Sequence, residues 1–201
     1  MITLNNGQKP MSARHQVEIL ANNLYSFDSL LISLQSEKQS KKHRIVGAFK
    51  KADIIKSYLA FISQSINIDN QKIIESKLDE LITDQIIESD IPDRNIEFSS
   101  IIELIHKFSE DQKLLDWFRI SNNLIGFTAG IYKSFVIINS EEISDFKNSL
   151  ENFDSAFSYL DISKIKLGLA RRKSVKHFIE NYDELKKETP NQLINIISQV
   201  V

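Results

Sequence analysis

The sequence predicts an all-α protein, folded as a single-domain bundle of about seven helices. In several long segments the apolar residues recur at alternating steps of three and four, the spacing of a helix that packs lengthwise on another helix. Glycine (5 residues) and proline (3 residues) are scarce among the 201 residues, so tight turns and β-hairpins lack the residues that they need. An apolar content of 42% and a charged content of 26% are ordinary for a globular domain with a substantial core.

The first forty residues predict an arm followed by a helix. Residues 1–10 are polar and include Pro10, so we expect a flexible N-terminal arm, with the bundle occupying residues 11–201. Ser12 is a candidate cap for the first helix, in which the helical spacing of apolar residues extends from Val17 to Leu34.

The clearest helical pattern lies between Ile45 and Ile66. Its apolar residues fall on two faces, and a helix with two apolar faces belongs near the centre of a bundle. A third helix is predicted to carry the apolar residues from Ile73 to Ile86. It ends before Pro92, which is the best candidate for a hinge within the domain.

The segment from Ser99 to Ile138 predicts further helices. Ser99 or Ser100 is expected to open a helix through Phe108, which continues or restarts at Leu114–Phe118. The pattern of Leu124–Ile138 fits a helix, although its last four residues alone also fit a buried strand. We prefer the helix because no partner strand is evident.

Small residues and caps give more detail in the second half of the chain. Gly126 and Gly130 are four residues apart, which predicts a close crossing of two helices. Asn139 with Glu142 predicts a capping box that opens a helix through Leu160, and Thr189 with Gln192 predicts another that opens the last helix. That helix has no charged residue, so it is either buried against the bundle or a contact surface for a homodimer or larger complex.

Several classes of function are disfavoured by composition. The chain has no cysteine, which excludes disulfides, thiol catalysis and thiolate metal sites. No run of about 18 apolar residues would span a bilayer, so we expect a cytoplasmic protein that does not enter the membrane. No glycine-rich phosphate loop, nucleophile elbow or dinucleotide fingerprint is present, and we expect no cofactor.

The remaining polar residues near apolar segments are not arranged as a site. His106 has only Glu103 and Glu110 at helical spacing, which does not predict a metal centre. Asp116 and Arg119 are expected to form an ion pair on a helix surface. Trp117 is expected in the core and not on a base-stacking platform.

Charge is segregated along the chain, although the formal net charge is only −2. Two short stretches, 38–56 and 164–176, contain 13 of the 25 lysine and arginine residues, against a single acid, Asp53. The stretch 69–97 contains nine acids against three basic residues. Such segregation predicts distinct charged faces, and the basic ones suggest an anionic partner.

The first basic stretch predicts a phosphate contact. Lys41, Lys42 and Arg44 precede the apolar pattern that begins at Ile45, where a helix N-terminus with added cations suits a phosphate, and Lys51 extends the same patch. The expected partner is nucleic acid, RNA in particular, or an acidic protein surface. The simpler interpretation is a solvated surface that keeps the protein soluble.

The second basic stretch contains Arg171, Lys173 and Lys176 as candidate nucleic-acid contacts, and a further pattern. Arg172 and His177 have four residues between them, which resembles the Arg-x4-6-His motif of the HEPN superfamily. Members of that superfamily are helical bundles and often metal-independent ribonucleases that act as dimers. The resemblance implies that His177 handles a ribose or leaving-group proton, and that Arg172 stabilises phosphate charge.

Helical geometry limits this pair. On one continuous helix Arg172 and His177 would point about 140° apart, and Arg172 would fall on an apolar stripe. There it must extend its charged end to solvent, find an acid or lie at an interface. A break between Gly168 and Ser174 would relax that geometry.

Three readings of function follow from these patterns. The first is a small helical accessory protein or subunit that binds nucleic acid or another anionic partner through its basic stretches. The second is a HEPN-like ribonuclease of a toxin or defence system, with Arg172 and His177 as catalytic residues. The third is a helical adaptor or immunity-type protein that binds another protein.

Overall fold

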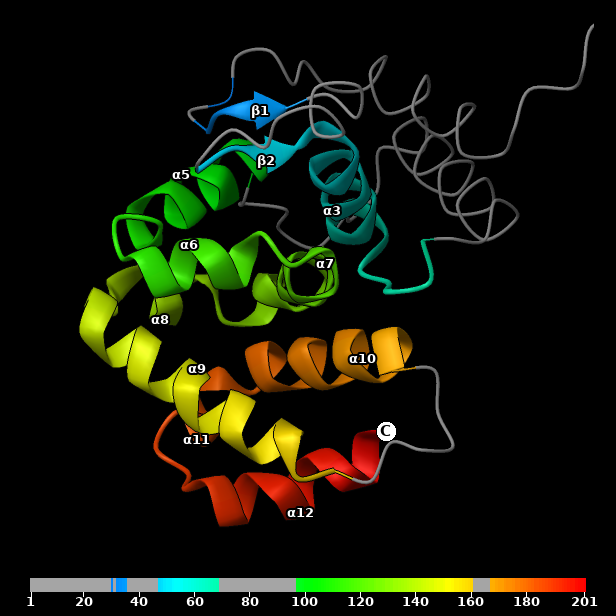
Figure 1. Cartoon of the computed structure of the whole chain (residues 1–201), viewed down its shortest axis with the longest axis vertical. Helices are drawn as coiled ribbons and strands as arrows, with labels where there is room; N and C mark the ends of the chain where they lie inside the picture. Colours follow the sequence, from blue (N-terminus) through cyan, green and yellow to red (C-terminus); the bar gives the residue numbers. More distant parts are fainter. Residues whose placement is uncertain (1–29, 31, 36–46, 69–96, 161–166) are drawn as a thin grey trace, which may run out of the picture.

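The all-α prediction is confirmed by the computed structural model, which describes residues 30, 32–35, 47–68, 97–160 and 167–201. The helices of these residues pack into one bundle (Figure 1). Their bounds are α3 (Lys51–Ser63), α5 (Phe98–Phe108), α6 (Gln112–Phe118), α7 (Ser121–Gly130), α8 (Phe135–Ser140), α9 (Ile143–Ser158), α10 (Leu167–Glu180), α11 (Tyr182–Leu185) and α12 (Pro190–Val200), with a 3-10 turn, η2 (Ile131–Lys133), between α7 and α8.

Several predictions fall outside the described residues. They concern the N-terminal arm, most of the first predicted helix, the third predicted helix, the hinge at Pro92, and the basic residues Lys41, Lys42 and Arg44.

Two short strands replace helix at two predicted positions. β1 (Leu34–Gln35) pairs in parallel with β2 (Phe49–Lys50), with Leu34 opposite Phe49. The predictions of helix at Leu34 and of a helix that begins at Ile45 are therefore wrong. Gly47 explains the later start, because its φ of 79° lies in the left-handed region, which right-handed helix does not use.

α3 occupies most of the rest of the predicted central helix and ends three residues before the predicted end at Ile66. It begins at Lys51 and ends where Gln64 adopts a left-handed conformation, with φ of 49°. The Ser65 N–H then donates to the Ala60 carbonyl over 3.2 Å, which satisfies one of the last helical carbonyls. Ile54, Leu59 and their neighbours are buried, and α3 packs against α7.

α5 and α6 are separate helices. Asp111 is the N-cap of α6, since its Oδ1 accepts hydrogen bonds from the N–H groups of Lys113 (2.8 Å) and Leu114 (3.2 Å). α5 begins at Phe98, one residue before the predicted caps, with Glu97 in the cap position. Asp116 and Arg119 form the expected ion pair at 3.4 Å.

α7 is the central helix of the described bundle. Every residue from Asn123 to Gly130 is buried, and the helix lies between α3 and α10 (Figure 1). The predicted close crossing is confirmed, and its partner is α10. A Cβ atom on Gly126 would lie 2.7 Å from the Val175 Cβ, and one on Gly130 would lie 2.6 Å from the Lys176 carbonyl oxygen. The backbones of α7 and α10 therefore meet directly.

The segment that fitted either helix or strand is helical, as preferred, in α7, η2 and α8. The predicted capping box of Asn139 and Glu142 is wrong. Asn139 belongs to α8, and Glu142 is itself the N-cap of α9, without a side-chain hydrogen bond. The Lys107 ammonium instead binds the Asn139 and Glu141 carbonyl oxygens, each at 2.9 Å, and thereby caps the end of α8.

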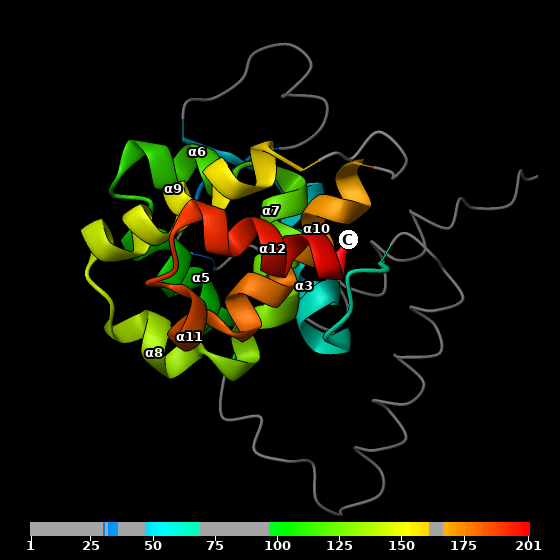
Figure 2. The ribbon, with the colours of Figure 1, turned by 90° about the horizontal axis from the view of Figure 1, so that it is seen from below.

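The last helix has the predicted capping box, formed by Thr189 and Gln192. Leu193 and Ile197 are buried, and α12 packs against α9 and α10, which Figure 2 shows from below. Its apolar face is thus covered by the bundle itself. Asn191, Asn195 and Gln199 are exposed on the other side, and a homodimer through this helix stays a prediction.

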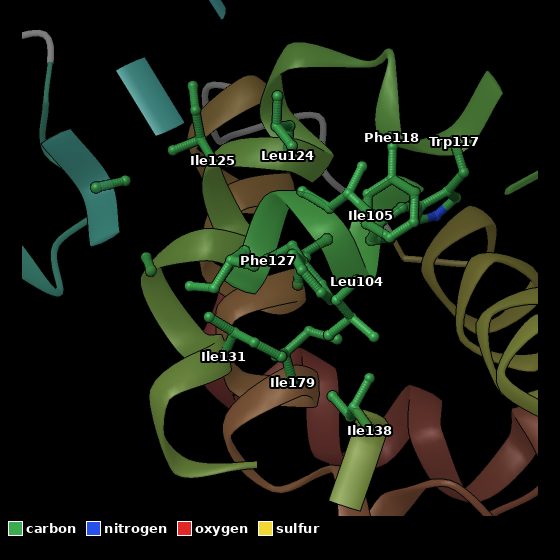
Figure 3. Close-up of a cluster of buried hydrophobic side chains, with 14 of the residues drawn as sticks. Leu104, Ile105, Trp117, Phe118, Leu124, Ile125, Phe127, Ile131, Ile138 and Ile179 are labelled. Carbon is green, nitrogen blue, oxygen red and sulfur yellow. The ribbon is translucent and has the colours of Figure 1, made fainter. Parts of the chain in front are cut away.

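The core is continuous across the helices. Figure 3 shows side chains of α5, α6, α7, η2, α8 and α10 meeting in one cluster, with Phe118 and Phe127 edge to face at 5.0 Å. Trp117 is buried in that core, as predicted. In the part of the chain that the structure describes, none of the helices is long and apolar enough to cross a bilayer.

Candidate polyanion-binding face

α10 carries the whole predicted motif from Arg171 to His177. It is one uninterrupted helix from Leu167 to Glu180, so the break that would relax the motif's geometry is absent. The side chains therefore point in different directions around one axis. Some of these side chains make contacts inside the bundle, and the others lie at its surface.

Arg171 is turned into the bundle. Its Nε donates to the Asn123 Oδ1 at 2.6 Å, and its guanidinium pairs with the Asp154 carboxylate. The guanidinium carbon lies 4.9 Å from the centre of the Phe153 ring and 4.7 Å from that of Phe157. With only 14% of its side chain exposed, Arg171 serves mainly to join α10, α9 and α7.

Two further side chains complete this interior network. The Trp117 indole Nε1 donates to the same Asp154 oxygen at 3.2 Å, and the Asn123 amide donates to the Trp117 carbonyl at 3.0 Å. Sequence reasoning missed Asp154 and the role of Asn123 as a partner of Arg171, because nothing local in the chain indicates which polar group a basic residue will meet.

Arg172 lies where α10 meets the start of α7 and the chain after α3. Its Nε donates to the Asn122 Oδ1 at 2.7 Å, and its NH1 donates to the Ile66 carbonyl at 3.3 Å. The sequence predicted solvent, an acid or an interface for this arginine, and two of the partners that it meets are instead an amide oxygen and a backbone carbonyl.

His177 points elsewhere. Its backbone carbonyl and its Nδ1 both lie within reach of the Asn181 amide, at 2.8 and 3.3 Å. Burial lowers the pKa of the imidazole below its ordinary value, with the Glu180 carboxylate opposing that shift. Within one chain, then, Arg172 and His177 do not form a joint site, and a site shared between two chains stays a prediction.

The remaining basic residues of α10, together with Lys133 and the acid Glu180, form a partly exposed surface that we call the α10 face. It consists of Lys133, which is exposed, and of Lys173, Lys176, His177 and Glu180, which are half-buried. Glu180 accepts from Lys176 and lies 3.8 Å from the Lys133 ammonium. Both of these lysines lower the pKa of His177, which places them close to it. Sequence reasoning missed Lys133 because it lies in η2, forty residues before Lys173.

Lys51 is not part of the α10 face. It opens α3, whereas Arg172 contacts the chain after the opposite end of that helix. The thirteen residues from Lys51 to Ser63 span twelve steps of 1.5 Å, which separates the two ends by about 18 Å. The two basic stretches therefore do not merge at Lys51.

Other types of site find little support in the described residues. Across those ranges, no three His, Asp or Glu side chains gather closely enough to hold a metal ion. His106 is exposed on α5. Comparisons of the chain with protein-family models, with curated proteins and with solved structures found no match.

Proposed function

We propose that this protein is a small helical accessory protein that binds a polyanion, nucleic acid, through the α10 face. The observation that carries the proposal is the gathering of Lys133, Lys176 and His177 around one carboxylate, that of Glu180, with Lys173 further along the same face of α10. Two segments far apart in the sequence contribute to it. Because Arg171 and Arg172 are engaged with other parts of the bundle, the proposal assigns recognition to the lysines.

Electrostatics support a phosphate backbone as the ligand. The α10 face contains three lysines, of which Lys133 and Lys176 share the single carboxylate of Glu180, so the surface keeps an excess of positive charge. Lys173 makes no ion pair with any described residue, and the Lys133 side chain is 66% exposed. Lysines of this kind release counterions when they meet phosphates, which favours binding that depends little on sequence.

The proposal predicts salt-sensitive binding of RNA or DNA. Reversal of charge in the variant Lys133→Glu/Lys173→Glu should weaken binding at least tenfold for every sequence tested. The plot of log affinity against log salt should become shallower by about one unit per lost contact. Fluorescence anisotropy with labelled single- and double-stranded oligonucleotides measures both quantities.

Lys113→Glu is the matched control for the single variant Lys133→Glu, which has the same change in net charge, because the Lys113 side chain is 72% exposed on α6 and belongs to another surface. Its affinity should stay close to that of the natural chain. An equal loss of affinity in the control would mean that net charge alone, and not the α10 face, determines binding. Unchanged affinity in the double variant would refute a role of the α10 face. Reversal of Lys41, Lys42 and Arg44 tests the first basic stretch in the same assay.

A further inference from the structure

A polar pocket of about 290 Å³ opens beside α9, among residues that the α10 face does not use. One wall is the stripe of α9 that contains Asp145, Asn148 and Asn152, spaced three and four residues apart. The opposite wall is the end of α11 and the residues after it, including Lys186 and Lys187. Such a volume lies at the small end of ligand sites, which span about 300–1,000 Å³.

Two buried hydroxyl groups form the floor. Tyr182 is 1% exposed, and its hydroxyl shares a hydrogen bond of 3.2 Å with the Ser149 Oγ. Burial raises the pKa of Tyr182 to about 12, with Asp145 and Glu141 adding to the rise, so the hydroxyl stays protonated. The floor is therefore uncharged but capable of hydrogen bonding, and the influence of Asp145 shows that its carboxylate lies near it.

The charged groups at the rim fall into two kinds. Lys186 is already held, by Glu141 at 2.8 Å and by Asp183 at 3.1 Å. Asp145 and Lys187 are exposed and form no ion pair with any residue that the structure describes. The amides of Asn148 and Asn152 likewise form no hydrogen bond within the described chain. One carboxylate, one ammonium and two amides thus remain available to a ligand.

We propose that this pocket binds a small zwitterion, a molecule of amino-acid to dipeptide size that carries both an ammonium and a carboxylate group. Its ammonium group pairs with Asp145 and its carboxylate with Lys187, while Asn148 and Asn152 donate to and accept from the atoms between them. A neutral polyol would leave both charges of the pocket unmatched, and a singly charged ligand would leave one.

Calorimetric titration of the full chain with alanine and alanylalanine tests the proposal and separates a free amino acid from a peptide end. At least one of the two should bind saturably below about 10 mM. N-acetylalanine and alanine amide, which each lack one charge, should bind at least tenfold more weakly. Glycerol should not bind.

Two variants test which residue of the pocket pairs with each charged group of the ligand. Asp145→Asn should weaken zwitterion binding at least fivefold but leave N-acetylalanine unaffected, whereas Lys187→Gln should weaken zwitterion binding but leave alanine amide unaffected. Ser144→Ala, at an exposed position of α9 outside the pocket, is the control. Absence of saturable binding, equal binding of the blocked compounds, or unchanged affinity in both variants would overturn the proposal. Thermal unfolding of each variant shows whether it is folded.

Discussion

Two adjacent arginines of α10 illustrate how single residues divide between structure and function. Arg171 and Arg172 follow one another in a basic run, yet each binds an asparagine at the start of α7, Asn123 and Asn122 respectively. Removal of the donor from a buried acceptor lowers the free energy of unfolding more than removal of the donor from an exposed one. We therefore expect both arginines to contribute mainly to stability.

This distinction gives a test of the Arg172–His177 pair. Arg172→Ala removes a donor from the Asn122 Oδ1 and from the Ile66 carbonyl, so it should lower the free energy of unfolding by about 1–3 kcal/mol. His177→Ala should lower it much less, because the Asn181 amide keeps its bond to the residue 177 carbonyl. Urea denaturation followed by circular dichroism measures both values.

An RNA assay without metal complements the stability measurement. If Arg172 has a structural role alone, its variant loses stability and nothing else. Metal-free cleavage of RNA by the natural chain that both variants abolish, while each remains folded, would instead favour the HEPN-like reading. Cleavage that survives in the His177→Ala protein would rule that reading out.

Among the elements, the pair α7 and α10 determines the geometry of the bundle. Gly126 faces the Val175 Cβ and the Arg172 carbonyl, and Gly130 faces the Lys176 carbonyl. The contacts of α7 with α10 advance in the same direction along both helices, so the two helices cross with the same general chain direction. Because these contacts involve backbone and Cβ atoms, neither helix can yield locally to a larger side chain.

Gly126→Ala should therefore destabilise the protein. A methyl group would approach the Val175 Cβ to 2.7 Å and the Arg172 carbonyl oxygen to 2.8 Å. The cost of forcing the helices apart, about 1–3 kcal/mol, should exceed the gain of up to about 1 kcal/mol in helix propensity. The midpoint of urea denaturation should fall accordingly.

Gly168→Ala is the control for that substitution, since its nearest neighbour is the side-chain amide of Asn122 at 3.1 Å, which adjusts more easily than backbone. It should cost less than Gly126→Ala. A Gly126→Ala protein as stable as the natural chain would show that the crossing is looser than the structure indicates.

Local sequence patterns predicted the parts of the fold that local chemistry determines. The capping box at Thr189, the close approach at Gly126 and Gly130, and the helical character of 124–138 were all readable from spacing. The start of α3 could not be predicted from spacing, because Phe49 forms a strand by pairing with Leu34, which lies on another segment of the chain. The centrality of α7 was also hidden, since its polar Asn123 and Thr128 are buried only in the assembled bundle.

In the candidate site, too, local sequence predicted some features, whereas others depend on tertiary packing. Lys173, Lys176 and His177 share one helix face, so their proximity follows from sequence. Lys133 reaches that face only through the packing of η2 against α10. The inward turn of Arg171 depends on Asp154 and Asn123, which lie 17 and 48 residues away in the chain.

For the whole molecule, buried Tyr182 gives stability a dependence on alkaline pH. Its folded-state pKa of about 12 exceeds the ordinary value of 10.0, so the folded chain holds the phenolic proton more tightly than the unfolded chain. The stabilisation is complete below pH 10 and is lost progressively as the pH rises from 10 towards 12. A shift of this size corresponds to about 2–3 kcal/mol.

Tyr182→Phe isolates this contribution from the lysines that titrate in the same range, among them Lys186, whose pKa is raised by its bonds to Glu141 and Asp183. Free energies of unfolding measured by urea denaturation between pH 8 and pH 11 should decline more steeply for the natural chain than for the variant. The lysines are present in both proteins, so only the difference between the two curves reports on the phenol. Parallel curves would mean that the Tyr182 hydroxyl is accessible to water in the folded state, which would also remove the uncharged floor from the proposed pocket.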